Sequence, residues 1–433
     1  MTGAADERVD KTVSLGGQEL LQAGTAVIIL LVLFLTLTPF PDLGDPRLLD
    51  ATTGNETTTY VVLLSLLALA SFLLRERLPL ILPAFYRWEY LLMSGVLLTS
   101  VVLSVDATAS AKRLTLAAST FVLAALLPWL TNGLRQFVAL VGATFAAVLA
   151  LSWFGVVAIP HLAIHQAFDV VEPELAGDWR GVFGHKNVTA GAMAIFTYVG
   201  WFVARGAWPA SGRVMAASAL VFLILTHGKS ALGMFFLASA VAFGVDRATS
   251  LKVRMLFALG PLALLNLLTV GSAMSESLHG LVSALPVDTT FTGRTDIWRF
   301  AFDAINAHPL TGTGFDAFWY SSGVRNGDDA TLRWMGDVAS SHNSYVDLTL
   351  TIGMLGLTGI IAAFIVLPLR DFHAACKMPR NREFARLLLI LWLFSLYDGT
   401  FEAFIFNRTN PMWFVIALAV CGLRYAASYE IRR

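Results

Sequence analysis

A cationic segment at residues 178–187 directly precedes an apolar stretch. It reads Asp-Trp-Arg-Gly-Val-Phe-Gly-His-Lys-Asn, and residues 188–205 are mostly apolar. If that stretch is a helix, its free N–H groups and its dipole favour an anion beside Arg180, His185, Lys186 and Asn187. An ordinary loop with Asn187 as the N-cap is the alternative. Because three residues that can be cationic crowd one helix start, we favour a functional anion site.

A second candidate segment runs from residue 292 to residue 315. Apolar residues recur at 297, 298, 301, 302 and 305, which is the spacing of one helix face. The pattern predicts an amphipathic helix over 295–307 at the membrane interface, ended by a turn that contains Pro309, Gly312 and Gly314. Arg294 stands just before this helix and is free to face a site. In the alternative interpretation the helix only caps the bundle.

A third candidate segment reads Ser-Ser-His-Asn-Ser-Tyr-Val-Asp at 340–347 and leads into an apolar stretch. An imidazole changes charge near neutral pH, which suits a general base, so His342 is the candidate. Asp347 is a candidate for orienting it. A single histidine is more often structural.

Ionisable residues at a membrane boundary are functional hypotheses by default, although many only snorkel or form ion pairs. Gly228-Lys-Ser lacks the glycine-rich stretch of a P-loop, so it does not predict ATP binding. Further candidates of this kind are His227, Lys229, Ser230, Lys112, Arg113, Asp398, Glu402 and Arg408.

Long apolar stretches must position these segments. The chain has 433 residues, of which 56% are hydrophobic and 14% charged, whereas a soluble domain has about 25% charged residues. We therefore exclude a soluble globular protein and predict an all-α integral membrane protein of about twelve transmembrane helices. The expected spans are 22–40, 58–74, 88–105, 112–130, 134–157, 188–205, 213–227, 231–245, 254–271, 346–369, 385–401 and 410–427. The proline-containing residues 78–84 suggest a short re-entrant or interfacial piece.

Twelve crossings put both termini on one side of the membrane. If that side is the cytoplasm, it holds 19 of the 30 basic residues, as the positive-inside rule requires. From the polar residues 1–20 we expect no cleavable signal peptide before the first helix. The expected regions are the tails 1–21 and 428–433, helices one to nine in 22–271 with an outer loop at 158–187, a large outer loop at 272–345, and helices ten to twelve in 346–427.

Cys376 and Cys421 lie far apart and form neither a disulfide framework nor a metal-binding spacing. The outer loops contain no Asp-x-Asp pair. We therefore expect no metal and no cofactor.

Taken together and in this order, the three segments resemble the bacterial O-antigen ligase and O-antigen polymerase superfamily of membrane glycosyltransferases. The resemblance is strongest over 178–360. Phe-Gly-His-Lys-Asn at 183–187 and Thr-Pro-Phe-Pro-Asp-Leu at 38–43 are most similar to the exopolysaccharide (succinoglycan-type) polymerase branch. An Arg-x10-Gly pattern starts at Arg180, but no second copy starts at Arg294 or Arg299, which departs from the two-loop polymerase pattern. The motifs are Arg180…Phe183-Gly-His-Lys-Asn187, Gly293-Arg294…His308-Pro-Leu-Thr-Gly-Thr-Gly314, Ser341-His-Asn-Ser-Tyr345 and Gly353-Met-Leu-Gly356.

The resemblance implies a GT-C-like enzyme of the bacterial inner membrane with a periplasmic active site. It would transfer or polymerise oligosaccharide repeats from undecaprenyl diphosphate, with inversion and without a metal. By resemblance, Arg180 and Arg294 bind the diphosphate and His342 takes the proton of the acceptor hydroxyl. The expected assisting residues are Lys186, His185, Asn187, Lys229, Arg113 and Arg408.

The ligase branch, which joins glycan to lipid A-core, shares these loops and stays an alternative. A lipid-linked glycan flippase would explain the helices but not the long outer loop, and such carriers tend to have related halves. A non-catalytic scaffold would need no Arg/His constellation. The expected partners are the lipid-linked oligosaccharide, a glycan or lipid A-core acceptor, the bilayer and other polysaccharide assembly proteins, but no nucleic acid.

Overall fold

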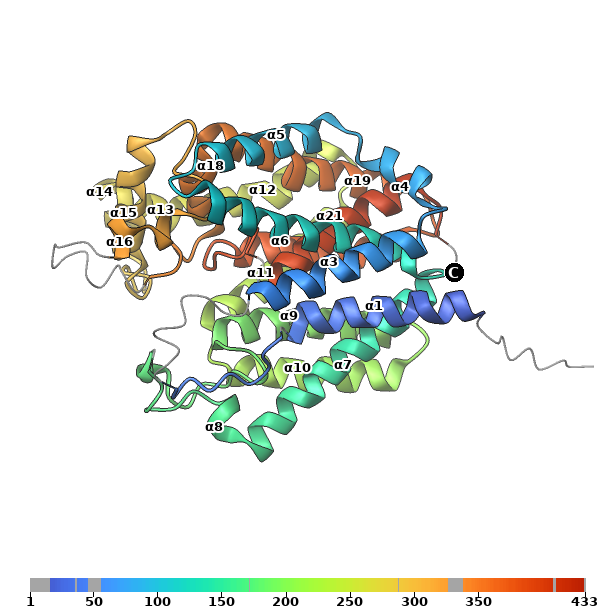
Figure 1. Ribbon diagram of the computed structural model, residues 1–433. Helices are drawn as coiled ribbons and strands as arrows, with labels where there is room; N and C mark the ends of the chain where they lie inside the picture. Colours follow the sequence, from blue (N-terminus) through green and yellow to red (C-terminus); the bar gives the residue numbers. More distant parts are fainter. Residues whose placement is uncertain are drawn as a thin grey trace, which may run out of the picture.

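The protein is an all-α integral membrane protein, seen here in a computed structural model. The structure describes residues 16–35, 37–45, 56–170, 172–286, 288–325, 338–407 and 410–431. Within these ranges the regular elements are helices, and one isolated β-bridge joins Ile164 to Trp179. Most of the long helices run side by side along one direction (Figure 1).

The longer helices form the bundle, and short ones connect or cover them. The long helices are α1 (Gly17–Leu35), α3 (Glu56–Leu73), α5 (Trp88–Val102), α6 (Ala107–Leu126), α7 (Leu134–Ala158), α9 (Lys186–Ala204), α10 (Pro209–Leu225), α11 (Lys229–Arg247), α12 (Leu251–Leu268), α18 (Ser344–Ile360), α20 (Arg382–Asp398) and α21 (Pro411–Ser428). The π-helical residues Ile361–Val366 continue α18 into α19 (Leu367–Ala375). The short helices are α4 (Leu78–Phe85), α8 (Pro160–Ala163), α13 (Val270–Met274), α14 (Glu276–Ser283), α15 (Arg294–Ala307) and α16 (Ser322–Arg325).

Each of the twelve expected spans contains a helix, but not every helix meets the criteria for crossing a bilayer. Among the described residues, eight helices are long and apolar enough, or nine if one bent pair counts as one span. That pair is Thr57–Leu73 with Leu78–Phe85, which meet at 116°. α5 and α10 are apolar but shorter. The membrane-spanning fold is therefore confirmed, whereas the number twelve stays a prediction.

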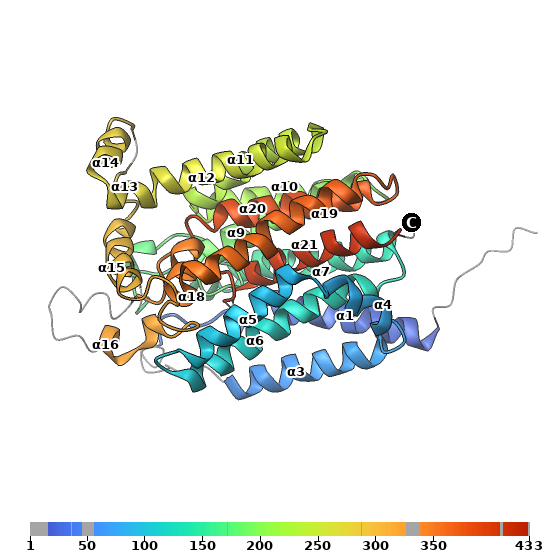
Figure 2. The same cartoon turned by 90° about the horizontal axis from the view of Figure 1, so that it is seen from above.

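The two expected outer loops lie at the same end of the bundle. In both views α13 to α16 and the segment that follows α8 gather at one end, and the C-terminus and the start of α1 lie at the other (Figures 1 and 2). We call the first of these the site end. It brings together the described parts of three segments that are far apart in the chain, namely 158–170 with 172–187, 272–286 with 288–325 and 338–345, and 399–407.

α21 lies at the centre of the bundle. In its membrane-spanning stretch 78% of the residues are buried, compared with 28% in the stretches of α11 and α12. The latter two helices therefore have most of their surface available to lipid. The buried Trp413 donates its indole N–H to the Ala117 carbonyl at 3.1 Å, and Trp392 donates to Phe364 at 2.7 Å. Since a buried indole needs a hydrogen-bond partner, these contacts fix α21 against α6 and α20 against the π-helical segment.

A kink in α18 holds the turn that follows α15. Gly353 has φ +66° and ψ −178°, which interrupts the helix. The carbonyls of Leu350 and Thr351 accept hydrogen bonds from Thr313 at 2.8 Å and Gly314 at 3.1 Å. Because these backbone groups pair directly, α15 is fixed relative to the start of α18.

Substitution of Gly353 by alanine is expected to destabilise the protein by about 2–4 kcal/mol, because the left-handed backbone and the steric overlap both disfavour a side chain. A Cβ at this position would lie 2.2 Å from the Leu310 carbonyl oxygen. The measurement is the fraction of monodisperse protein in detergent after heating. Gly95→Ala in α5 is the control, since a Cβ there meets nothing within 4 Å. Equal stability of the two variants would contradict the structural role of the kink.

Candidate active site

The N-terminus of α9 is capped by a histidine. His185 has an extended backbone, and its Nδ1 accepts the Asn187 N–H at 3.0 Å. Its Nε2 lies 3.0 Å from Glu172 Oε2, so the proton is on Nε2 and donates to the carboxylate. The alternative of Asn187 as the N-cap is therefore wrong. The hydrogen bond from His185 lowers the pKa of Glu172 despite burial, and the nearby His342 adds to this effect.

A second imidazole caps the same helix. The buried His165 accepts the Lys186 N–H on Nε2 at 3.3 Å, and its Nδ1 lies 3.2 Å from Asp169 Oδ2. Burial and the neighbouring His185 lower the pKa of His165, although Asp169 acts in the opposite direction. The N–H groups of Lys186 and Asn187 are thus used within the protein. The expected anion site at this helix start must instead use side chains.

Lys186 forms an ion pair with Asp178, at 2.5 Å between Nζ and Oδ2. The other oxygen of that carboxylate lies 2.5 Å from Nδ1 of His227. Burial opposes ionisation of Asp178, but the hydrogen bonds from Lys186 and His227 outweigh it and lower its pKa. Lys229, the first residue of α11, is exposed two residues after His227. Asp178 therefore joins Lys186 to His227, and Lys229 follows His227 at the start of α11.

Arg180 is fully buried. Its guanidinium donates to the carbonyls of Phe183 at 3.2 Å and Pro41 at 2.9 Å, and Nε has no partner among the described residues. Burial lowers the pKa of Arg180, whereas the charges of Asp169 and Asp42 oppose this. The resemblance implies a direct contact with a diphosphate. In this structure the side chain instead joins the loop before α9 to the segment after α1.

Replacement of Arg180 by methionine is therefore expected to lower the amount of folded protein. The buried carbonyl of Phe183 and the partly buried carbonyl of Pro41 would lose their donors, at about 1–3 kcal/mol for each unsatisfied group. Immunoblots of membranes and size-exclusion profiles in detergent measure this loss. Arg205→Met is the control, because Arg205 is exposed at the other end of α9. A normal level of Arg180→Met protein without activity would instead favour direct contact with the ligand.

The centre of the site is the carboxylate of Glu402, in the loop between α20 and α21. Its Oε1 accepts from Asn187 Nδ2 at 2.8 Å and from Arg294 Nη2 at 3.0 Å. Its Oε2 lies 3.8 Å from Nδ1 of His342. One carboxylate thus joins the starts of α9 and α15 to the segment before α18.

Burial opposes ionisation of Glu402, but His342, Arg294 and His185 outweigh it, so its pKa lies below the ordinary value. The carboxylate is therefore charged at neutral pH. The 3.8 Å contact is too long for a hydrogen bond, and Nδ1 of His342 is buried without a partner among the described residues. In enzymes, the contacts of a general base are often long without substrate and tighten when it binds.

The backbone around His342 is held on both sides. The Ser341 carbonyl accepts the indole N–H of Trp298 at 3.0 Å. Asn343 is the N-cap of α18, and its Nδ2 donates to the Thr400 carbonyl at 2.8 Å. His342 itself has φ +51°, a left-handed conformation that is uncommon for a residue with a side chain. The surrounding contacts therefore hold a strained residue in place, as often occurs at functional sites.

Asp347 does not orient His342. Its Oδ1 accepts from the Ser341 N–H at 3.0 Å and from Trp319 Nε1 at 3.1 Å. Among the described residues, the carboxylate paired with the imidazole is that of Glu402, which the sequence indicated only as one of several boundary charges. One feature of the sequence could have pointed to Glu402. Asp398 and Glu402 both follow directly after a long apolar stretch, and no basic residue lies between Asp398 and Glu402.

Two of the residues expected to assist at the diphosphate are not part of this cluster in the described structure. Arg113 lies 3.8 Å from Asp316, and its guanidinium lies over the Tyr320 ring at 4.2 Å. It therefore contacts the segment after α15 and not the Glu402 carboxylate. Arg408 lies outside the described residues. Within the described ranges, no three His, Cys, Asp or Glu side chains gather closely enough to hold a metal ion.

Two comparisons with known proteins bear on this site. The family model of O-antigen ligase matches residues 214–361, which include α15, His342 and the start of α18. The exopolysaccharide production protein ExoQ of Rhizobium meliloti (strain 1021) is 25% identical over 192 residues, or 41% of this chain. These matches support the O-antigen ligase and polymerase superfamily. The resemblance seen in the sequence is thereby confirmed, although the match spans only 43% of the ExoQ length.

Proposed function

We propose that this protein is a glycosyltransferase that polymerises oligosaccharide repeats carried on undecaprenyl diphosphate. The observation that supports it is the contact of Arg294 and His342 with one charged carboxylate at the site end. A phosphate-binding cation and a base beside each other are what this transfer needs. A flippase or scaffold requires neither.

In the proposed reaction, a hydroxyl oxygen of the acceptor sugar attacks the anomeric carbon of the donor sugar. The new C–O bond forms as the bond to the diphosphate breaks, and the electron pair leaves with the carrier. One displacement inverts the anomeric configuration. His342 takes the hydroxyl proton on Nε2, while Nδ1–H faces Glu402, whose negative charge stabilises the imidazolium that forms.

Arg294 is the residue that we assign to the leaving diphosphate. Its contact with Glu402 uses one of the five N–H donors of a guanidinium, so others are available for phosphate oxygens. Cations that face the leaving group stabilise the charge that develops on it without a metal. Lys186 and Lys229 supply further positive charge, His185 and Asn187 fix the start of α9, and Arg180 positions the loop.

We propose the bacterial inner membrane as the location, with both termini in the cytoplasm and the site end in the periplasm. The acceptor is then a growing glycan. The likeness to an exopolysaccharide production protein favours polymerisation over transfer to lipid A-core.

A comparison of glycans from a gene-deletion strain and its complemented strain tests this function. The polymerase proposal expects loss of long polymer and accumulation of lipid-linked single repeats on deletion. Long polymer that remains on the carrier but is absent from lipid A-core would indicate a ligase. Unchanged surface and lipid-linked glycans would contradict both.

Glu402→Gln is expected to lower the transfer rate by about 10- to 100-fold, because the uncharged amide no longer stabilises a protonated His342, a contribution of about 1.5–3 kcal/mol. The amide oxygen still accepts from Asn187, so the loop stays in place. The rate in membrane vesicles measures this effect. Glu276→Gln in α14 is the control, since Glu276 is exposed. An undiminished rate for Glu402→Gln would exclude the carboxylate from the mechanism.

A further inference from the structure

A cavity of about 150 Å³ lies beside the candidate site. Ser340 and Ser344, which flank His342 in the chain, both line it. Ser340 Oγ accepts the His342 N–H at 3.3 Å, and Ser344 Oγ donates to the Glu402 carbonyl at 2.8 Å. The segments that hold the candidate base and its carboxylate therefore also form a wall of this cavity.

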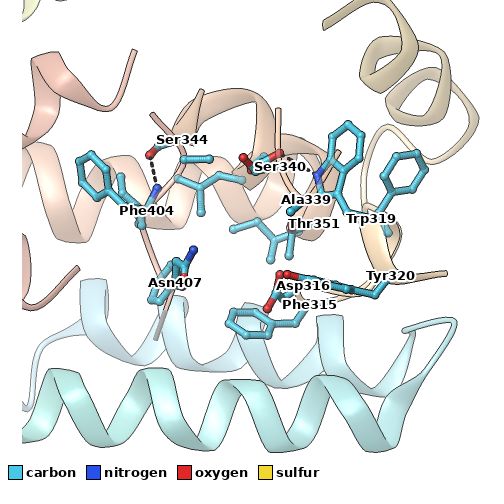
Figure 3. Close-up of a pocket in the computed structure, with 17 residues that line it drawn as sticks. Phe315, Asp316, Trp319, Tyr320, Ala339, Ser340, Ser344, Thr351, Phe404 and Asn407 are labelled. Atoms are coloured by element: carbon cyan, nitrogen blue, oxygen red, sulfur yellow. Dashed lines mark hydrogen bonds between the residues drawn. The ribbon is translucent and has the colours of Figure 1, made fainter. Parts of the chain in front are cut away.

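The cavity combines aromatic walls with polar groups. Figure 3 shows Phe315, Asp316 and Tyr320 on one side of the open space, and Ser340, Thr351, Trp319 and Ser344 on the other. The aromatic lining residues are Phe315, Phe318, Trp319, Tyr320, Phe404 and Phe406. The carboxylates in the lining belong to Asp316 and Asp347.

Both carboxylates are held in position. Asp347 is fixed by the Ser341 N–H and the Trp319 indole. On the opposite wall, Asp316 forms an ion pair with Arg113 at 3.8 Å. The Arg113 guanidinium also lies over the Tyr320 ring at 4.2 Å. The cavity is thus preorganised, which reduces the entropy cost of binding a ligand.

The lining restricts the class of ligand. A phosphate would be repelled by the carboxylate of Asp347, and a lipid chain would remove that carboxylate from water without giving it a hydrogen bond. A sugar ring satisfies both constraints, because its hydroxyls donate to carboxylates and its C–H faces pack against aromatic rings. The volume of about 150 Å³ leaves room for a sugar ring between these walls.

We infer that this cavity binds the terminal sugar residue of the acceptor glycan. The assignment to the acceptor rests on the proposed function, in which His342 takes the proton of the acceptor hydroxyl. The cavity places that sugar next to the segment 340–344 that carries the base. Asp347, which does not orient His342, acquires a role here as a hydrogen-bond acceptor for sugar hydroxyls.

The test is binding of a lipid-free oligosaccharide to the full-length protein in detergent. The probe is the single-repeat oligosaccharide released from the lipid-linked pool of the deletion strain, measured by saturation-transfer NMR and titration calorimetry. Two variants act on the cavity in different ways. Asp347→Asn removes the charge but keeps an oxygen for Ser341 and Trp319, and Ala403→Leu fills the space from the loop. The matched control is Ala307→Leu, at an exposed position at the end of α15.

Asp347→Asn is expected to raise the Kd for the oligosaccharide by about tenfold or more, as the loss of a hydrogen bond to a charged group does. Ala403→Leu is expected to raise the Kd because the larger side chain occupies the space of the sugar ring. Ala307→Leu should bind like the wild type. Inorganic pyrophosphate should bind all variants equally, and this equal binding would show that the variants are folded. It should not displace the oligosaccharide.

Unchanged oligosaccharide binding in both cavity variants, or no binding to the wild type, would overturn the inference. Displacement by pyrophosphate would overturn it too, since the sugar would then lie at Arg294. Sugar binding that depends on Asp347 in a protein without transfer activity would support a sugar site and contradict the proposed function alone.

Discussion

Replacement of His342 by alanine is expected to lower the rate of glycan transfer by about 10²- to 10⁴-fold, the usual contribution of a general base. The side chain is 37% exposed and its Nδ1 lacks a hydrogen-bond partner among the described residues, so the fold loses little. The measurement is the length distribution of surface glycan at equal protein level in the membrane. Short chains and lipid-linked single repeats are the expected products.

Two further variants separate catalysis from structure. His342→Asn removes the base but tolerates the left-handed backbone at φ +51° better than alanine does. It should therefore be as inactive as His342→Ala and at least as stable. His279→Ala is the control, because His279 is exposed on α14. Full polymer length in either His342 variant would remove the base from the mechanism.

Replacement of Arg294 by alanine is expected to lower kcat/KM for the lipid-linked donor by about 10²- to 10³-fold, as the loss of a donor to a developing negative charge does. It also leaves Glu402 with one fewer cation. Arg294→Lys should recover only part of the activity, since an ammonium is a point charge and lacks the planar fork that binds phosphate oxygens in pairs. The initial rate in membrane vesicles at several donor concentrations measures both effects.

Arg299→Lys is the matched control for Arg294→Lys. Arg299 lies on the same helix, is about half exposed and pairs with Asp296 at 3.0 Å. Its replacement should leave the rate within about twofold, because exposed ion pairs contribute little. An equal loss in both variants would mean that α15 does not tolerate the exchange of an arginine for a lysine at either position, and would contradict a specific role for Arg294.

Much of the fold follows from local pattern. The apolar stretches predicted a helix at every expected span, and the spacing of Ile297, Trp298, Ala301 and Ile305 predicted α15 almost to the residue. These signals are local, since burial of one face or of a whole segment is encoded within one helix. The number of membrane crossings was less predictable, because α5, α10 and α20 are short or carry charges at their ends.

The partners within the site could not be predicted. Asn187, Arg294, His342 and Glu402 come from four segments, and their contacts depend on how the helices pack. The sequence suggested Asp347 as the partner of the histidine, yet Asp347 bonds to Trp319 and Ser341. The sequence also suggested that Arg180 faces a ligand. Its burial against two carbonyls depends on tertiary packing and could not be predicted from the sequence.

The most direct measurement uses the purified protein in liposomes with a single lipid-linked repeat and no other protein. We predict formation of two-repeat and longer lipid-linked products, with one undecaprenyl diphosphate released for every linkage formed. His342→Asn and Arg294→Ala should release almost none, while His279→Ala should match the wild type. Equal release by the wild type and His342→Asn, or no release by a wild type that binds the donor, would contradict the account.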